Sequence, residues 1–498
     1  MQKLSIIVKD LVVRTQENIV LDGISFSLKQ NENLAILGNS ESGKTTLAKA
    51  ITGKIHFTGS IVTNFEDTTV KHARIEFVEQ RYSFKNLSGT NDFYYQQRFN
   101  SFDANDAPTI FEELLKVSSE DSKQTNNINF ALQILGIENL KDSSLIQLSS
   151  GEHKRFQLVK ALLNPPKLLI LDTPYTGLDV LSVKKLNNIL ADISEKGTQI
   201  ILIAGTFPIS DFITHIAVLG NKKLEFFGEK EDFDPEKLIP IKETKYTYNN
   251  DLLPVSNEKF KFDTVVKMKD ISIHYGDHII LQHLNWKIDP GEKWLLKGRN
   301  GAGKSSLLSF ITGDHPQAYS NEIYLFGKRR GSGESIWDIK QKTGYISPEL
   351  HAYFDKNITC FQAIGSGYFD TIGLFKKLNK QQYHNILQWL DFLQISHVST
   401  KPLHSISASL QRVILLARAL VKNPPLLVLD EPCQGLDKKQ SAQFVSLIDH
   451  ICLASNKTLI YVSHDESNIP ACVQKVLELK NGGYQIYPIE QIAALAVA

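Results

Sequence analysis

Two stretches of the chain carry glycines, a lysine and hydroxyl residues at a spacing that can hold a phosphate chain. They read GNSESGKTT (Gly38–Thr46) and GRNGAGKSS (Gly298–Ser306), and their first glycines lie 260 positions apart. In such a loop the backbone N–H groups close around phosphates, the lysine reaches the β- and γ-phosphates, and the hydroxyl binds Mg²⁺. We therefore expect two nucleotide sites, with ATP and Mg²⁺ as cofactors.

A carboxylate after a buried strand is the usual second partner of Mg²⁺ beside such a loop. Asp172 and Asp430 each follow a short apolar run. We expect each of them to hold the metal, directly or through water, together with a loop hydroxyl. The predicted metal pairs are Thr45 with Asp172 and Ser305 with Asp430.

The second half carries further groups suited to hydrolysis. Glu431 follows Asp430 and can activate the attacking water. His464 ends another apolar run and can contact the γ-phosphate, and Lys304 completes the predicted catalytic set. Tyr275 lies 23 residues before Gly298.

A third anion-binding feature begins at Leu148–Glu152, which reads LSSGE. The stripe Phe156, Val159 and Leu163 follows it, and this spacing predicts a helix. Because a helix N-terminus attracts anions, its first residues are expected to contact phosphate. The predicted nucleotide-binding residues are Gly38, Gly43, Lys44, Thr45, Thr46, Gln80, Ser149, Gly151, Asp172, Tyr275, Gly298, Asn300, Gly301, Gly303, Lys304, Ser305, Ser306 and Asp430.

The elements that position these residues occur twice in the same order. Each half runs through short strands, a glycine loop with its helix, helical segments, an apolar strand that ends in Asp, and a further helix and strand. In the first half, turns are expected at Asp22-Gly23 and Asn31–Asn33. The sequence predicts two homologous α/β domains, residues 1–228 and 263–498, each with a mixed β-sheet core and a helical subdomain. Residues 229–262 are charged and contain prolines, as expected of a linker.

Composition narrows the class of protein. The formal net charge is +1, which does not call for nucleic acid or an acidic membrane surface, so nucleic acid is a disfavoured partner. No apolar run approaches the roughly 20 residues that span a bilayer. The four cysteines form no C-x-x-C pair. We expect a cytoplasmic protein with reduced thiols, one that could lie against the inner face of the plasma membrane.

Taken together, the two loops, LSSGE, the strand-ending Asp residues and His464 resemble the ABC ATPase family over nearly the whole chain. The resemblance implies that the two cassettes pair with each other and that each ATP lies between the loop of one and the LSSGE-type signature of the other. It also implies separate transmembrane subunits as partners. The runs Thr312–Lys340 and Ser366–Gly373 look like double-cassette proteins labelled as molybdate-type transport proteins, and in older usage as photorepair proteins.

The two halves differ at the residues that matter for hydrolysis. The first half has Thr173 in place of Glu431, Gly205 or Thr206 in place of His464, and Thr15 in place of Tyr275. The second half lacks the signature glycine and has Ser409 instead. With head-to-tail pairing, these differences all fall on the site of the first loop, whereas the lack of a counterpart of Gln80 in the second half falls on the other site. We therefore hypothesise one hydrolytic site and one site that holds ATP as a clamp.

Several patterns leave alternatives open. The second half lacks a counterpart of Gln80, and Glu349 or Ser347 could substitute for it. Lys328–Gly333 could contact phosphate or nucleic acid, or form a solvated hairpin tip. Cys433 is near the chemistry and is expected to be a small buried filler. The aromatic stretch 81–103 is either a partner-binding segment or a packed surface loop.

The work that ATP hydrolysis drives has three possible forms. The chain could energise a transporter, by resemblance one for molybdate. It could act as a soluble ABC ATPase on DNA, ribosomes or another complex. It could also be a nucleotide-gated clamp with negligible turnover.

Overall fold

The computed structural model describes residues 4–15, 18–39, 41–65, 74–79, 107–116, 124–145, 148, 150–163, 166–176, 178, 180–204, 209–235, 253–254, 262–275, 278–313, 315–355, 357–480 and 482–492. These residues form two compact units, which divide between positions 242 and 243. The proposed linker bounds stay a prediction, because much of that stretch lies outside the described residues.

The first unit is built on a six-stranded sheet in which five strands run parallel and the last is antiparallel. The strands, in spatial order, are β5 (Ile75–Val78), β6 (Leu168–Asp172), β7 (Gln199–Ile203), β3 (Leu34–Leu37), β8 (His215–Gly220) and β9 (Lys223–Glu229). The sequences of β3, β6 and β7 are almost wholly apolar because side chains on both faces are buried.

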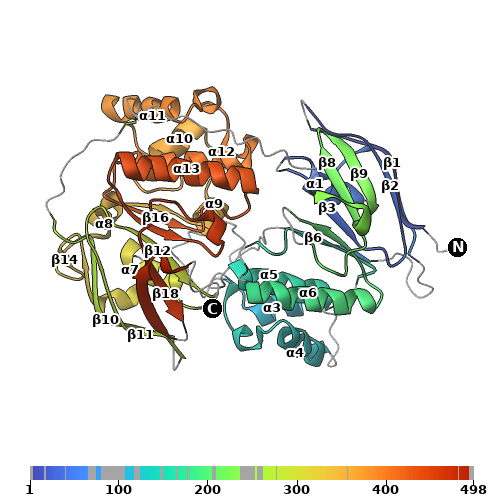
Figure 1. Ribbon diagram of the computed structural model, residues 1–498, viewed down its shortest axis with the longest axis horizontal. Coiled ribbons are helices and arrows are strands. Elements are labelled where there is room, and N and C mark those ends of the chain that lie inside the picture. The colour runs from blue at the N-terminus through green and yellow to red at the C-terminus, as the bar shows by residue number, and fades with distance from the viewer. Residues whose placement is uncertain are drawn as a thin grey trace. The chain divides into compact units, whose positions relative to one another are not determined.

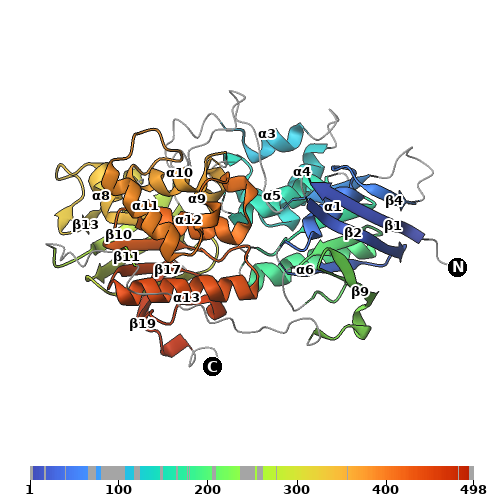
Figure 2. The same cartoon turned by 90° about the horizontal axis from the view of Figure 1, so that it is seen from above.

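Different elements cover the two faces of this sheet. One face packs against α3 (Ile110–Leu115), α4 (Gln124–Ile134), α5 (Ser150–Leu162) and α6 (Val180–Glu195). The other face packs against α1 (Lys44–Ile51) and a three-stranded antiparallel sheet of β2 (Asn18–Lys29), β1 (Leu4–Thr15) and β4 (Thr58–Thr63), as Figures 1 and 2 show. The described part of this unit also contains the short 3₁₀ helices Glu138–Leu140 and Lys230–Asp232.

The prediction of a turn at Asp22-Gly23 is wrong. Both residues lie inside β2, at a shift in its register with β1. Gly23 has φ +68°, and the N–H of Asp22 donates to the Lys222 carbonyl (2.8 Å) instead of to β1. The Asp-Gly pair therefore forms a β-bulge, which uses the same left-handed glycine as a turn and is hard to distinguish from one in a sequence. The turn expected at Asn31–Asn33 is present between β2 and β3.

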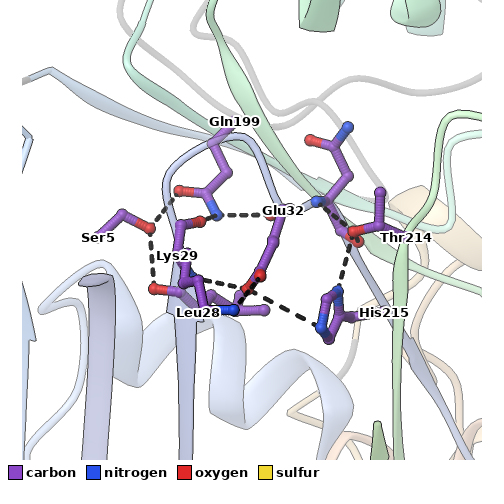
Figure 3. A network of polar contacts seen from close by, with 8 residues as sticks. Ser5, Leu28, Lys29, Glu32, Gln199, Thr214 and His215 are labelled. Atoms are coloured by element: carbon purple, nitrogen blue, oxygen red, sulfur yellow. Dashed lines mark hydrogen bonds and ion pairs between the residues drawn. The ribbon is translucent and has the colours of Figure 1, made fainter. Parts of the chain in front are cut away.

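A buried polar network joins the antiparallel sheet to the base of the parallel sheet (Figure 3). Gln199, at the start of β7, is 3% exposed. Its amide donates to the Lys29 and Glu32 carbonyls, and its Oε1 accepts from the Ser5 hydroxyl at 2.7 Å. One side chain thus fixes β1, the β2–β3 turn and β7 relative to one another, and so fixes where β3 delivers its glycine loop.

The second unit repeats this plan. Its six-stranded sheet contains β15 (Thr343–Ile346), β16 (Leu426–Asp430), β17 (Thr458–Val462), β12 (Lys293–Gly298), β18 (Lys475–Lys480) and antiparallel β19 (Gly483–Pro488). A four-stranded antiparallel sheet contains β11 (His278–Ile288), β10 (Val266–Tyr275), β13 (Glu322–Leu325) and β14 (Lys328–Arg329).

The helices of the second unit also divide between the two faces of the sheet (Figure 1). One face packs against α9 (Pro348–Tyr353), α10 (Cys360–Gly365), α11 (Lys380–Phe392), α12 (Ala408–Leu420) and α13 (Lys438–Ala454). The other packs against α7 (Lys304–Thr312), α8 (Ile336–Lys342) and the antiparallel sheet. The 3₁₀ helices are Pro316–Tyr319, Ser366–Tyr368, Ser396–Val398, Leu403–Ser405 and Glu466–Asn468. Among the described helices, none is both long and apolar enough to cross a bilayer.

The prediction that Lys328–Gly333 is solvated is confirmed for every residue of the stretch except Arg330. The β13–β14 turn is at Phe326-Gly327, both with positive φ. The side chain of Arg330 is 1% exposed and pairs with Glu334 at 3.1 Å, while the Glu334 carboxylate also accepts from two backbone N–H groups. The stretch is therefore solvated except at Arg330, whose side chain forms a buried ion pair with Glu334. The four cysteines are buried and free, as predicted.

Candidate functional site

In each unit, neighbouring parallel strands bring the predicted site residues to one edge of the sheet. In the second unit, β16, β17 and β12 are adjacent, and their carboxyl ends are Asp430, Val462 and Gly298. The glycine loop, Glu431 and His464 all follow these ends directly. The same order, β6-β7-β3, places Asp172 beside the first loop.

Both glycine loops have the conformation that their sequences predict. Gly43 and Gly303, which immediately precede α1 and α7, have φ of +94° and +90°. A Cβ atom at either would lie 2.6 Å from a side-chain carbon of the preceding hairpin. Only glycine suits this position, because a side chain would face both left-handed strain and a steric clash.

The two loop lysines are held by their own loops. Lys44 Nζ donates to the carbonyls of Gly38 and Asn39, both at 2.7 Å. Lys304 Nζ makes the equivalent bonds to Gly298 (2.8 Å) and Arg299 (3.0 Å). Each ammonium group is therefore positioned beside the loop N–H groups that could surround a phosphate. Thr46, Asn300, Gly301 and Ser306 lie in the same loops or the first turn of the helices that follow them.

The first predicted metal pair is in direct contact. Thr45 Oγ1 donates to Asp172 Oδ2 at 2.8 Å. Burial raises the pKa of Asp172, while the Thr45 bond and the Lys154 charge oppose that rise. A hydroxyl and a carboxylate are ligands that Mg²⁺ accepts, provided that phosphate oxygens and water fill the remaining positions. Among the described residues, no three His, Cys, Asp or Glu side chains gather as a metal site.

Two side chains contact the Glu431 carboxylate, one at each oxygen. Gln434 Nε2 donates to Glu431 Oε2 at 3.0 Å, and His464 Nε2 lies 2.9 Å from Oε1. The histidine contact is not aligned as a hydrogen bond, and it is an ion pair only when the ring is protonated. The structure thus brings together the two predicted catalytic side chains Glu431 and His464. It adds Gln434, which sequence reasoning missed although its counterpart in the first half, Thr176, could have flagged the difference.

The first unit keeps the backbone of this turn without the carboxylate. Thr173 and Glu431 have φ of +44° and +42°, and each N–H donates to the last residue of the neighbouring strand, Ile203 at 3.0 Å and Val462 at 3.1 Å. The Thr173 hydroxyl is buried and has no hydrogen-bond partner among the described residues. A β-branched residue rarely adopts this left-handed conformation, so the surrounding turn imposes it.

The two phosphate loops differ in charge. Glu41 occupies the position of Gly301, with φ of +69° against +82°, and Asn39 occupies the position of Arg299. The side chains of Glu41 and Arg299 are both exposed. Apart from the shared lysine, the first loop therefore carries one negative charge and the second one positive charge. The sequence comparison had not used this difference.

Other predicted residues are placed less completely. Gly151 is buried in the first turn of α5, and Ser407, at the start of the second signature, caps α12 by accepting from the Leu410 N–H (3.2 Å). Tyr275 is the last residue of β10, but its side chain lies outside the described part. The following residues are entirely outside it: Gln80, Ser149, Gly205 and Thr206.

Ser347 is not a substitute for the missing glutamine. It is fully buried, and its hydroxyl caps α9 by accepting from the Leu350 N–H at 3.0 Å. Counting from the strands β5 and β15, Gln80 corresponds to Pro348, which has no polar side chain. Glu349 is in the first turn of α9, and its substitution for the glutamine stays a prediction.

Comparison with known sequences matches these features. A family model described as "ABC transporter" matches residues 21–176 and 281–434. The ABC transporter ATP-binding protein ModF of Escherichia coli (strain K12) is 34% identical and covers 94% of this chain and 95% of its own length. An uncharacterised ABC transporter ATP-binding protein of Schizosaccharomyces pombe is also 34% identical, over 93% and 95% of the two chains. The closer resemblance predicted from Thr312–Lys340 and Ser366–Gly373 is thus confirmed.

Solved structures match the fold over nearly the whole chain. An RNase-L inhibitor has a TM-score of 0.53 at 18% identity and covers 98% of this chain and 92% of its own. A model of ribosome-bound archaeal Pelota and ABCE1 has a TM-score of 0.60 at 17% identity, with 98% and 80% covered. At these identities the likeness concerns the fold alone.

Proposed function

We propose that only the second phosphate loop of this chain serves a hydrolytic site. The premise is that the chain belongs to the ABC transporter family and is an ATPase with two cassettes. The first loop would bind nucleotide without hydrolysing it. One observation carries the proposal: Glu431 is oriented by Gln434 and His464, whereas the same left-handed position in the first unit holds Thr173, which cannot act as a base.

The chemistry follows from the second unit's own residues. Bound ATP would supply the phosphoric anhydride, and Mg²⁺ would neutralise charge on its phosphates. The loop N–H groups and Lys304 would hold the β- and γ-phosphates, and Ser305 with Asp430 would hold the metal. Glu431 would orient and deprotonate the attacking water. Gln434 fixes one carboxylate oxygen and leaves the other to face His464.

The site is completed by a signature from another cassette in the arrangement that the family resemblance implies. The intact signature, with Gly151 buried at the start of α5, belongs to the first unit. The altered signature, with Ser409 hydrogen-bonded to Ser407 (2.9 Å), belongs to the second. Head-to-tail pairing would give the second loop the intact signature, and so would place Glu431, His464 and that signature in one site, while Gln80 has no direct counterpart there.

Steady-state ATP turnover of the purified chain tests this division. Glu431→Gln should lower turnover by roughly 10²–10⁴-fold, because it removes the base and keeps the shape. Thr173→Ala, at the matched position of the first unit, should leave turnover within about twofold. Equal losses in both variants, or an active Glu431→Gln variant, would contradict a single hydrolytic site.

Hydrolysis by this chain would energise a transporter, possible cargoes including molybdate. Its relatives over full length are named as ABC transporter ATP-binding proteins, and separate membrane subunits would then be required. Copurification of the tagged chain with an integral membrane partner from detergent extract supports this role. The alternative is a soluble ABC ATPase or nucleotide-gated clamp that acts on DNA, ribosomes or another complex. Salt-sensitive cosedimentation with nucleic acid or ribosomes, without a membrane partner, would favour it.

A further inference from the structure

A cavity of about 20 Å³ lies in the second unit, away from the phosphate loop. It is lined by Thr312, Lys340, Thr343, Tyr345, Leu350, Asp370, Ile372 and Arg418. Thr312 is the last residue of α7 and Thr343 the first of β15, so the cavity is at the end of each element that is remote from the nucleotide. The nine residues of α7 separate it from the loop by about 12 Å.

Arg418 brings an uncompensated charge to this cavity. It is 4% exposed, and its guanidinium donates to the Ser366 hydroxyl and the Thr371 carbonyl, both at 3.1 Å, with the Phe354 ring 5.3 Å away. All three partners are neutral, and none of the ion pairs among the described residues includes Arg418. A buried charge of this kind is costly unless an opposite charge lies nearby.

The surrounding charges increase the imbalance. Lys422 pairs with Asp370 and also donates to the Lys340 carbonyl at 2.5 Å. Burial, and then repulsion by Arg418 and Lys340, lower the pKa of Lys422 to about 8, despite the attraction of Asp370. Asp370 thus pairs with Lys422, while Arg418 has no ion pair among the described residues.

The cavity wall also offers an unused hydroxyl. Thr343 is 4% exposed, and its Oγ1 has no hydrogen-bond partner among the described residues. A hydroxyl can donate to an anion at no cost in charge. The same small space therefore contains both an excess of positive charge and a buried donor.

The first unit shows how the fold otherwise neutralises this position. Lys160 in α5 corresponds to Arg418 in α12, and it pairs with Glu113 of α3 at 2.8 Å. The helices α3 and α10 begin with the same capping box, at Thr109 and Thr359. Counted from these caps, the counterpart of Glu113 is Ala363, which is fully buried. The second unit has therefore lost the internal carboxylate that the first unit retains.

We propose that this cavity in the second unit binds a small inorganic anion, which takes the place of the missing carboxylate beside Arg418. The volume suits an occupant about the size of one water molecule, and so a halide ion. The anion accepts from Thr343 and Arg418 and neutralises part of the local charge. It thereby stabilises the junction between α12, β15 and the segment that carries Asp370.

The test exchanges anions at constant ionic strength. The thermal unfolding of the full chain, saturated with Mg-ADP to occupy the phosphate loops, is measured in sodium gluconate and in sodium bromide. Bromide should raise the Tm of the second unit by about 3 °C. This is the shift expected when the bromide concentration exceeds the Kd of one site several-fold. In crystals grown in bromide, the anomalous signal should show a peak within hydrogen-bond distance of Thr343 Oγ1.

Matched variants separate the site from general salt effects. Ala363→Glu supplies the carboxylate found in the first unit, and should raise Tm in gluconate and abolish the bromide response. Thr343→Val keeps the shape of the side chain and should weaken the bromide response. This variant provides the test if the Ala363→Glu variant does not fold. An equal bromide response in wild type and both variants would overturn the proposal. So would a cavity without an anomalous peak, because water alone would then fill it.

Discussion

Glu41 should weaken nucleotide binding at the first phosphate loop. Its exposed carboxylate is on the loop itself, at the position that Gly301 occupies in the second loop, and both residues have the same left-handed backbone. Glu41→Gln removes the charge with little change of shape. The loop backbone, Lys44 and the Thr45–Asp172 pair all remain.

The size of the effect follows from charge separation in solvent. Two unit charges about 7 Å apart in water interact by roughly 0.6 kcal/mol, and Mg-ATP carries about two net negative charges. The repulsion is then about 1 kcal/mol at low salt, or roughly fivefold in Kd. At physiological ionic strength the Debye length is about 8 Å, which should reduce the gain to about twofold.

Binding of a fluorescent ATP analogue measures the change in nucleotide affinity at each site separately. In a Lys304→Ala background, which disables the second loop, Glu41→Gln should tighten binding about fivefold at low salt. In a Lys44→Ala background, the reciprocal Gly301→Glu should weaken the second site by a similar factor. The first loop shows that a glutamate tolerates this backbone. A gain independent of salt, or no gain in either direction, would refute the electrostatic explanation.

Three further predictions concern the catalytic turn and a buried lysine. Gln434→Leu should lower kcat by about tenfold with little change in KM, since Gln434 donates a hydrogen bond to the proposed base Glu431; an unchanged kcat would remove its positioning role. Thr173→Glu alone should not create a second hydrolytic site, whereas Thr173→Glu with Thr176→Gln, in a Lys304→Ala background, should give more turnover than either change alone. Burial lowers the pKa of Lys457 to about 8, and its partners Asn423 and Pro424 are neutral. The unfolded chain therefore binds the extra proton between pH 8 and about 10.5, so stability should rise with pH in this window by up to about 1.4 kcal/mol per unit; in chemical denaturation, Lys457→Met should flatten the slope.

The strand-loop-helix order could be predicted because its signals are local. A run such as Leu168–Leu171 is apolar on both faces, and the glycines of the loops need left-handed φ angles that other residues resist. The bulge at Asp22-Gly23 could not be predicted, because the same dipeptide suits a hairpin turn. Only the pairing of β1 with β2 decides between the two.

The burial of two polar side chains could not be predicted, because the sequence does not show which neighbours they contact. Arg330 looks like a surface charge in the sequence, yet Glu334 and the ring of Tyr319, 5.1 Å away, enclose it. Ser347 looks like a free hydroxyl, yet it caps α9. In both cases the identity of the side chain was known but its partner was not, so burial could not be inferred.

The turn after the strand-ending Asp separates scaffold from chemistry. Thr173 and Glu431 share their φ angle and their backbone hydrogen bonds although their side chains have nothing in common. The neighbouring strands β7 and β17 therefore set the turn, and the side chain contributes only reactivity. Thr173 has a strained left-handed backbone and a buried hydroxyl with no hydrogen-bond partner among the described residues, and both features lower the stability of the fold. The surrounding structure must therefore hold the turn in this conformation. In the proposed division between the cassettes, hydrolysis at the first loop would be lost through changes of side chains, with the phosphate loop, the metal pair and the sheet edge left intact.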